Sequence, residues 1–201
     1  MKNDFKLIGN GQTIRSDEEM LLVDKAVADN AFKRYKKDIL DSTLAQYGFL
    51  KWKTNAYVRL NDIGLLEYID LQKERYGSKT FCVNFAIMPL YCPTYYMEIG
   101  LGDRLGMYIL GKDFWWDYAN EDCAKASFQN VADAIKIYLL PWFEQYNNEK
   151  NYKKRLSKDK LKKFITYSNQ TWLEALDSPD KEEVIQENIR NLKLPKKLIC
   201  R

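Results

Sequence analysis

The sequence contains no histidine among its 201 residues. This absence excludes Ser-His-Asp and Cys-His catalytic arrangements, histidine-ligated metals and proton switching by imidazole near neutral pH. The chemistry that remains belongs to Asp, Glu, Lys, Tyr and Cys. Because no subset of these residues forms a recognisable catalytic set, we expect a protein that is not an enzyme and has no cofactor.

Cysteines are also few, and no two of them form a CxxC pair. Without histidine, a zinc site would need all four of them, so we expect no metal site. An even cysteine count is weak support for disulfides in a chain without an export signal, and we expect reduced thiols. The four are Cys82, Cys92, Cys123 and Cys200.

Long apolar runs are missing as well. The longest strongly apolar stretch, Ile137 to Phe143, has seven residues and includes Pro141, whereas a membrane-spanning helix needs about 20. The first residues carry charges at Lys2, Asp4 and Lys6 and show no signal-peptide pattern. We therefore expect a cytoplasmic protein with no membrane segment.

The net charge of +4 is small for the whole chain but unevenly distributed. Residues 149–163 hold eight Lys or Arg residues against two acidic residues, and the rest of the chain is slightly acidic. Three parts are expected: an N-terminal extension (1–22), an α+β domain (23–146) and a basic helical C-terminal tail (147–201), packed on the domain or appended to it.

Two long helices are predicted from apolar residues at spacings of three and four. The first runs from Asp24 to Tyr47 and stops at Gly48, and the second runs from Glu121 to Tyr146 with a kink or restart at Pro141. A shorter helix should follow Asp180 and end near Leu192.

Between the long helices the apolar period changes to two, which predicts strands. Residues 49–52 and 56–60 should form a hairpin, and residues 65–72 and 80–88 a second one that turns at Arg75-Tyr76-Gly77 and pairs Glu74 with Ser78. Further strands are expected at 95–99 and 104–110. The fold class is α+β: an antiparallel sheet of about four to five strands with two long helices on one face.

The odd-numbered positions of the second hairpin are apolar and should form the buried face of the sheet. Glu67 fits this face badly, and we expect it near the margin of the sheet. The even-numbered positions are mostly polar. Tyr68, Gln72 and Asn84 on that side are candidates for a partner-binding platform, and the alternative is a solvated or helix-covered face.

An aromatic loop supplies the other candidate residues for partner binding. Adjacent Trp115 and Trp116 should point to opposite sides, so that one of them could face a partner together with Arg104. The alternatives are that both indoles close the core and that Arg104 forms a structural clamp with Asp113 or Asp117.

The order of several short motifs resembles the bacterial family of domain of unknown function 4304, over about residues 28–146. The resemblance implies a small α+β bacterial domain and no established catalytic residues. The motifs are Tyr47-Gly48-Phe49, Tyr57-Val58-Arg59, Leu71-Gln72-Lys73, Phe81 to Ile87, Arg104-Leu105-Gly106, Asp113 to Trp116 and Leu140 to Glu144.

Our leading hypothesis is a non-enzymatic module that binds another protein. One version is an immunity-type protein that blocks a toxin. The alternative is a nucleic-acid-associated protein that uses its basic tail, with phosphate contacts from Lys153, Lys154, Arg155 and Lys160. The other meaning of such a basic run is a solvated helix face, or one docked on the acids of its own domain.

Overall fold

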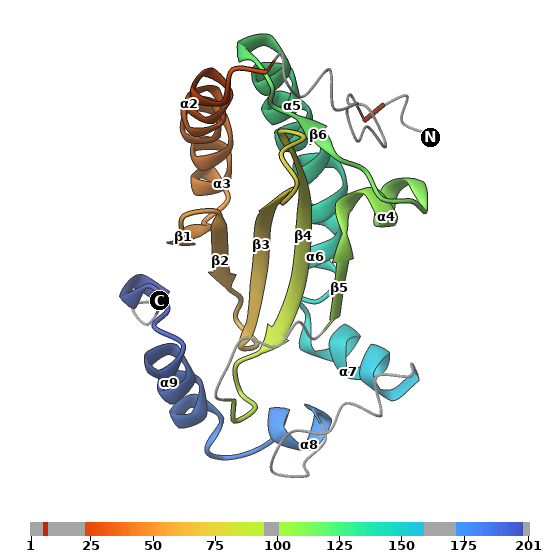
Figure 1. Cartoon of the computed structure of the whole chain (residues 1–201). Helices are drawn as coiled ribbons and strands as arrows, with labels where there is room; N and C mark the ends of the chain where they lie inside the picture. The colour runs from red at the N-terminus through yellow and green to blue at the C-terminus, as the bar shows by residue number, and fades with distance from the viewer. Residues whose placement is uncertain (1–5, 8–22, 95–100, 159–171, 199–201) are drawn as a thin grey trace. The chain divides into compact units, whose positions relative to one another are not determined.

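A computed structural model of the chain describes residues 6–7, 23–94, 101–158 and 172–198 (Figure 1). Its contacts divide the chain into two compact units. The first unit comprises residues 1–49, 70–85 and 103–140, and the second comprises residues 50–69, 86–102 and 141–201. The expected extension at 1–22, apart from residues 6–7, and the expected strand at 95–99 lie outside the described residues.

The first long helix is confirmed and consists of three consecutive segments: α2 (Lys25–Tyr35), a π-helical turn (Lys36–Asp41) and α3 (Ser42–Gln46). The Asp24 carboxylate caps its start by accepting hydrogen bonds from the backbone N–H groups of Ala26 and Val27. Gly48 has a φ of 79°, the left-handed conformation predicted for the residue that stops the helix.

The second long helix is confirmed too, as α5 (Glu121–Ala134), a π-helical turn (Ile135–Leu139) and α6 (Leu140–Glu144). Proline lacks an N–H, and its ring crowds the carbonyl of the preceding turn. The wider π turn directly before Pro141 is one of the recognised ways in which a helix absorbs such a break. The predicted irregularity at Pro141 is therefore present.

The antiparallel sheet has the strand order β1-β2-β3-β4-β5, with a short sixth strand, β6, paired to β4. The predicted hairpins are confirmed. The strands are β1 (Leu50–Lys53), β2 (Ala56–Leu60), β3 (Leu65–Lys73), β4 (Thr80–Pro89), β5 (Leu101–Arg104) and β6 (Trp116–Asp117).

The core of the first unit lies on the odd-numbered face of β4, as the alternation predicted. Phe81 is fully buried there, and its ring centroid lies 5.4 Å from that of Phe32 on α2 and 5.0 Å from that of Phe128 on α5. The two helices also pack against each other. The opposite face of β4 is not simply solvated, because Cys82 is also buried.

Two strand predictions need correction. Glu67 does not lie near the margin of the sheet. It is fully buried on β3, which lies between β2 and β4. Arg59 of β2 donates a hydrogen bond to its carboxylate. The turn between β3 and β4 also differs, because the N–H of Glu74 donates to the carbonyl of Thr80 rather than pairing with Ser78. The ion pair explains how a carboxylate can occupy an apolar face.

The strand predicted at 104–110 is wrong, because residues Leu105–Leu110 form the helix α4. Leu105 and Gly106 at the start of this helix are both buried. A Cβ on Gly106 would lie 2.5 Å from the Cβ of Phe114, so the glycine permits this close approach. Gly111, with a φ of 69°, ends the helix in the left-handed conformation.

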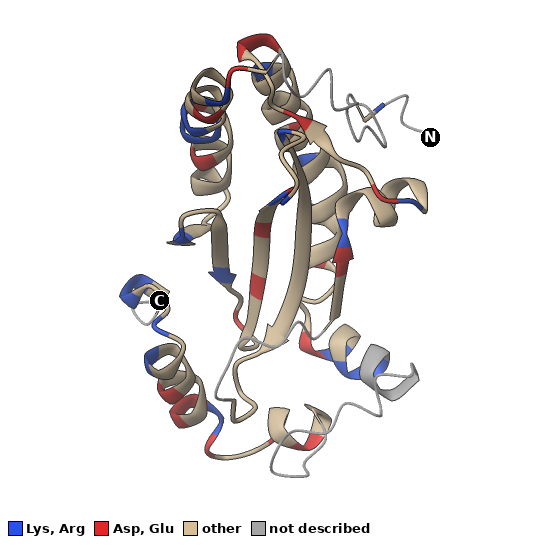
Figure 2. Ribbon diagram, viewed as in Figure 1, with Lys and Arg blue, Asp and Glu red and all other residues tan. Residues whose placement is uncertain are grey.

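The C-terminal region contributes α7 (Glu149–Lys158), α8 (Trp172–Leu176), α9 (Lys181–Asn191) and a 3₁₀ turn (Lys196–Leu198) to the second unit. The predicted last helix is α9, which has acidic residues in its first turn and a basic residue in its last (Figure 2). None of the helices among the described residues is long and apolar enough to cross a bilayer.

Contacts within the second unit show that the described part of the C-terminal region is packed. The Asn188 side chain donates to the carbonyls of Leu90 and Cys92, both at 2.7 Å, and accepts from the N–H of Thr94. The hydroxyl groups of Tyr91 and Tyr152 lie 2.9 Å apart and are buried. These bonds tie α7 and α9 to the chain segment that follows β4.

Candidate functional site

The predicted polar platform is a closed hydrogen-bond network where the structure describes it. The Asn84 amide donates to the carboxylate of Asp70 at 3.3 Å and to the side-chain carbonyl of Gln72 at 3.2 Å. Tyr68, in the second unit, packs its ring edge-on against Trp52 with centroids 6.2 Å apart. The amide of Asn84 thus donates within the sheet, and the role of this face in partner binding stays a prediction.

The two tryptophans point to different environments, as predicted for adjacent residues. Trp116 is fully buried, its ring stacks on Phe81, and its indole N–H donates to Asn130 at 3.0 Å. A partner cannot contact Trp116 in this position. The prediction that it binds a partner is therefore corrected: Trp116 is a core residue.

Trp115 is only partly buried and remains accessible. The guanidinium of Arg104 lies 5.5 Å from the centre of its ring and pairs with the Asp113 carboxylate at 2.6 Å. The clamp considered for Arg104 is thus present, with Asp113 as its partner. Such a paired arginine is already neutralised and is a poor anion site.

The basic tail is only partly described. Lys153 pairs with Glu149 and Asp177, while Lys154 is exposed. The side chain of Arg155 and the whole of Lys160 lie outside the described residues. Lys153 itself is thus paired with acids of its own chain, and the role of the basic run in nucleic-acid binding stays a prediction.

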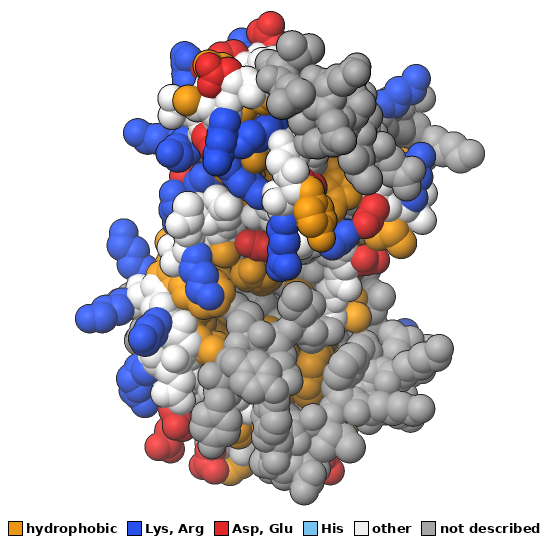
Figure 3. Space-filling view, in the orientation of Figure 1, with side chains coloured by type: hydrophobic (Ala, Val, Ile, Leu, Met, Phe, Trp, Pro, Cys, Tyr) orange, Lys and Arg blue, Asp and Glu red, His pale blue; other side chains and the backbone are white. Residues whose placement is uncertain are grey.

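A site that the sequence analysis did not identify lies at the β3–β4 turn in the first unit. There a hollow of about 700 Å³ lies between the turn and the start of α2, and we call it the basic hollow. Figure 3 shows basic side chains gathered on the face that carries α2 and the adjoining ends of β3 and β4. The hollow is lined by Val23, Lys25, Asp29, Lys73, Glu74, Arg75, Tyr76, Gly77, Lys79 and Tyr118.

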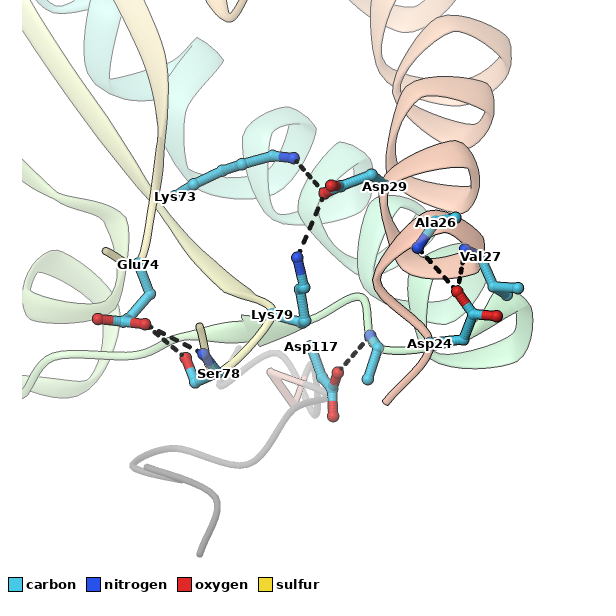
Figure 4. Close-up of polar contacts among 10 residues, drawn as sticks. Asp24, Ala26, Val27, Asp29, Lys73, Glu74, Ser78, Lys79 and Asp117 are labelled. Atoms are coloured by element: carbon cyan, nitrogen blue, oxygen red, sulfur yellow. Dashed lines mark hydrogen bonds and ion pairs between the residues drawn. The ribbon is translucent and has the colours of Figure 1, made fainter. Parts of the chain in front are cut away.

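The turn is braced by the Glu74 side chain. Its carboxylate accepts a hydrogen bond from the N–H of Tyr76 at 2.6 Å. It also accepts bonds from the N–H and the hydroxyl of Ser78, both at 3.1 Å (Figure 4). Gly77 and Lys79 have positive φ values of 99° and 57°. This internal bonding leaves Tyr76 at the tip, 89% exposed.

Within the basic hollow, two lysines form ion pairs with one carboxylate. The ammonium groups of Lys73 and Lys79 lie 3.2 Å and 3.6 Å from the same oxygen, Oδ1, of Asp29 (Figure 4). The Lys73 ammonium also lies 3.9 Å from the ring centre of Phe32 and 4.7 Å from that of Tyr118. Strand β3, the turn, helix α2 and the segment after β6 thus converge on one charge cluster.

The pKa values of this cluster follow from burial and pairing. Burial lowers the pKa of the Lys73 ammonium, and the bond to Asp29 only partly opposes this change. Burial alone would raise the pKa of Asp29, but the hydrogen bonds and charges of Lys73 and Lys79 lower it overall. Burial also raises the pKa of the Tyr118 phenol, which therefore stays neutral at neutral pH.

One signal in the sequence could have revealed this site. Three cations lie within seven residues around a predicted turn, in the segment Lys73-Glu74-Arg75-Tyr76-Gly77-Ser78-Lys79. A hairpin turn brings such residues together whatever the rest of the fold does. The contribution of Asp29 could not be found in this way, because it comes from a helix 44 residues earlier.

Chemically, the arrangement suits the binding of carboxylate groups. Lysine ammonium ions form charge-assisted hydrogen bonds with carboxylates, and an exposed tyrosine adds contact area with little loss of side-chain entropy. Within the described residues, no group of three or more Cys, Asp or Glu side chains could hold a metal ion. The cationic lining also argues against a metal in the hollow.

Comparison with known families identifies a match. Residues 40–145 match the sequence model of a family described as Domain of unknown function (DUF4304). The match begins later than the resemblance at about residue 28, so α2 precedes it while the β3–β4 turn and Tyr118 lie inside it. No curated protein and no solved structure matches the chain.

Proposed function

Since the chain belongs to the DUF4304 family, whose description assigns no activity, we propose a function from the geometry: a non-enzymatic module that binds an acidic protein segment in the basic hollow. The observation that carries this proposal is the lining of the hollow. Its lining contains four cationic side chains and two carboxylates, those of Asp29 and Glu74, beside the exposed Tyr76. The four cations are Lys25, Lys73, Arg75 and Lys79.

A protein partner is favoured over nucleic acid by the mixture of groups in the hollow. Arginine and tyrosine are enriched at the energetic centres of protein interfaces, and both lie at the tip of the turn, as Arg75 and Tyr76. Nucleic-acid backbones instead favour continuous positive surfaces, and the carboxylates of Asp29 and Glu74 interrupt this one.

The proposal places the protein in the bacterial cytoplasm. An immunity-type role is its most specific version, in which the hollow receives carboxylates of a toxin and covers the surface around them. Nucleic-acid association through the basic tail is the alternative, and phosphate contacts from Lys153 would have to displace the carboxylates of Glu149 and Asp177.

The test compares two double variants that each remove two positive charges. Lys25→Gln/Arg75→Gln changes exposed residues of the basic hollow, whereas Lys112→Gln/Lys125→Gln changes exposed residues of the same unit outside it. Binding of hexaglutamate is measured by titration calorimetry at low salt for both variants and for the unchanged protein. We expect the hollow variant to bind at least about tenfold more weakly, and the control to stay within about twofold.

Capture from extract of the source cells then identifies the natural partner. The unchanged protein and the Lys112→Gln/Lys125→Gln control should retain the same acidic protein, and hexaglutamate should release it. Equal hexaglutamate binding by the hollow variant, or captured material that nuclease treatment releases, contradicts the proposal. The second result would favour nucleic-acid association instead.

A further inference from the structure

We infer that Asp29 is a built-in substitute for the partner's carboxylate, occupying the place between Lys73 and Lys79 that an acidic group of the partner takes on binding. This inference rests on the proposed function and adds how the site is regulated. It makes Asp29 an internal competitor that weakens binding, and the lysine pair the groups that recognise the ligand.

A negative charge between the two lysines stabilises both of them. Both ammonium groups lie within 4 Å of one atom, Asp29 Oδ1, so the two like charges repel each other and an anion between them offsets this repulsion. In this structure Asp29 of α2 supplies that charge. A carboxylate from a partner can supply the same charge in the same place.

The position of the cations does not depend on Asp29 alone. The Lys73 ammonium rests on the faces of Phe32 and Tyr118, which attract a cation through their ring quadrupoles. The Lys79 side chain is only 12% exposed and starts from a left-handed backbone position in a turn that Glu74 braces. When Asp29 withdraws, the pair remains arranged for another anion, and such preorganisation favours binding.

Exchange needs only a local movement. The Asp29 side chain is about one-third exposed on the surface of α2, so rotation about its own bonds can release the lysines while Phe32 of the same helix stays in the core. The two lysines and Tyr118 lie inside the family match at 40–145, whereas Asp29 precedes it. The cation pair therefore lies within the matched range, and the competing carboxylate lies before it.

The decisive experiment compares Asp29→Asn with Asp38→Asn. Both substitutions remove one negative charge from the same continuous helix, but Asp38 is exposed, pairs with Arg34 and does not line the hollow. Titration with hexaglutamate at low salt should show about tenfold tighter binding for Asp29→Asn than for the unchanged protein, because a competing charge is gone. For Asp38→Asn the affinity should change by less than about twofold.

The outcomes separate this inference from the proposed function. If the unchanged protein binds hexaglutamate and Asp29→Asn binds equally or more weakly, the inference is overturned and the proposed function stands. If neither protein binds, the proposed function fails as well.

Thermal unfolding gives a second readout in case Asp29→Asn lowers stability. Its lysines then lack an anion, so hexaglutamate should raise the unfolding temperature of Asp29→Asn more than that of Asp38→Asn. Sodium chloride at equal ionic strength serves as the control for screening. An equal rise for both variants argues against the inference. Asp29→Ser provides an independent substitution for the same comparison.

Discussion

Truncating Trp116 should destabilise the protein far more than truncating its neighbour Trp115, and this contrast tests whether the structure assigns the two residues correctly. Trp116 is fully buried, stacks on Phe81 and donates to Asn130. Trp115 is partly exposed beneath Arg104. The perturbations are Trp116→Ala and Trp115→Ala.

The magnitude follows from the buried area. A tryptophan side chain buries about 150–250 Å², which at about 25 cal/mol per Å² corresponds to about 4–6 kcal/mol. The acceptor of Asn130 also loses its donor, and an unsatisfied buried group costs about 1–3 kcal/mol. Since the cavity can partly relax, we expect Trp116→Ala to lower the free energy of unfolding by about 4–6 kcal/mol.

Trp115→Ala removes a partly exposed ring and one cation–π contact. Exposed contacts of this kind are worth about 0.5–1 kcal/mol, and the loss of partial burial adds about as much. The expected cost is therefore about 1–2 kcal/mol. The test rests on the difference in the free energy of unfolding between the two variants, because differences between variants are more reliable than absolute sums.

Urea unfolding followed by far-ultraviolet circular dichroism measures both variants without depending on tryptophan fluorescence. In a chain of this size each kcal/mol lowers the unfolding temperature by about 2–4 °C, so Trp116→Ala should unfold about 10–20 °C below the unchanged protein. If Trp116→Ala costs less than about 1 kcal/mol, or less than Trp115→Ala, then Trp116 is not the core residue described above.

Two further predictions concern the second unit and the turn. Asn188→Ala leaves the carbonyls of Leu90 and Cys92 without their side-chain donor, so urea unfolding should show a loss of about 2–4 kcal/mol, and a loss below about 1 kcal/mol would contradict the contacts. A further prediction concerns acid. In the folded protein the pKa of Glu74 is lowered from 4.5, because backbone and hydroxyl hydrogen bonds outweigh the effect of burial, and that of Asp29 is lowered from 3.8 by its lysines. The unfolded chain therefore binds protons more readily than the folded one, and the free energy of unfolding should fall as the pH drops below about 4.5. Urea titrations at several pH values should show a smaller fall for Glu74→Gln.

Much of the secondary structure could be predicted because it depends on local pattern. The apolar spacing from Asp24 to Tyr47 and the left-handed Gly48 defined the first helix, and the period of two defined β3 and β4. The failure at 104–110 is also local. An apolar run of this length fits a strand or a helix equally well, and the close approach of Gly106 to Phe114 decided between them.

The sequence alone determined the two long helices, the two hairpins, the apolar face of β4 and the absence of histidine chemistry, since these follow from residue type and period. Only the tertiary structure decided which tryptophan is buried, how Glu67 is tolerated and where charges meet. The basic hollow shows the reason. Asp29 and Lys73 lie far apart in the sequence, and only the packing of α2 beside the β3–β4 turn brings their charges within hydrogen-bonding distance.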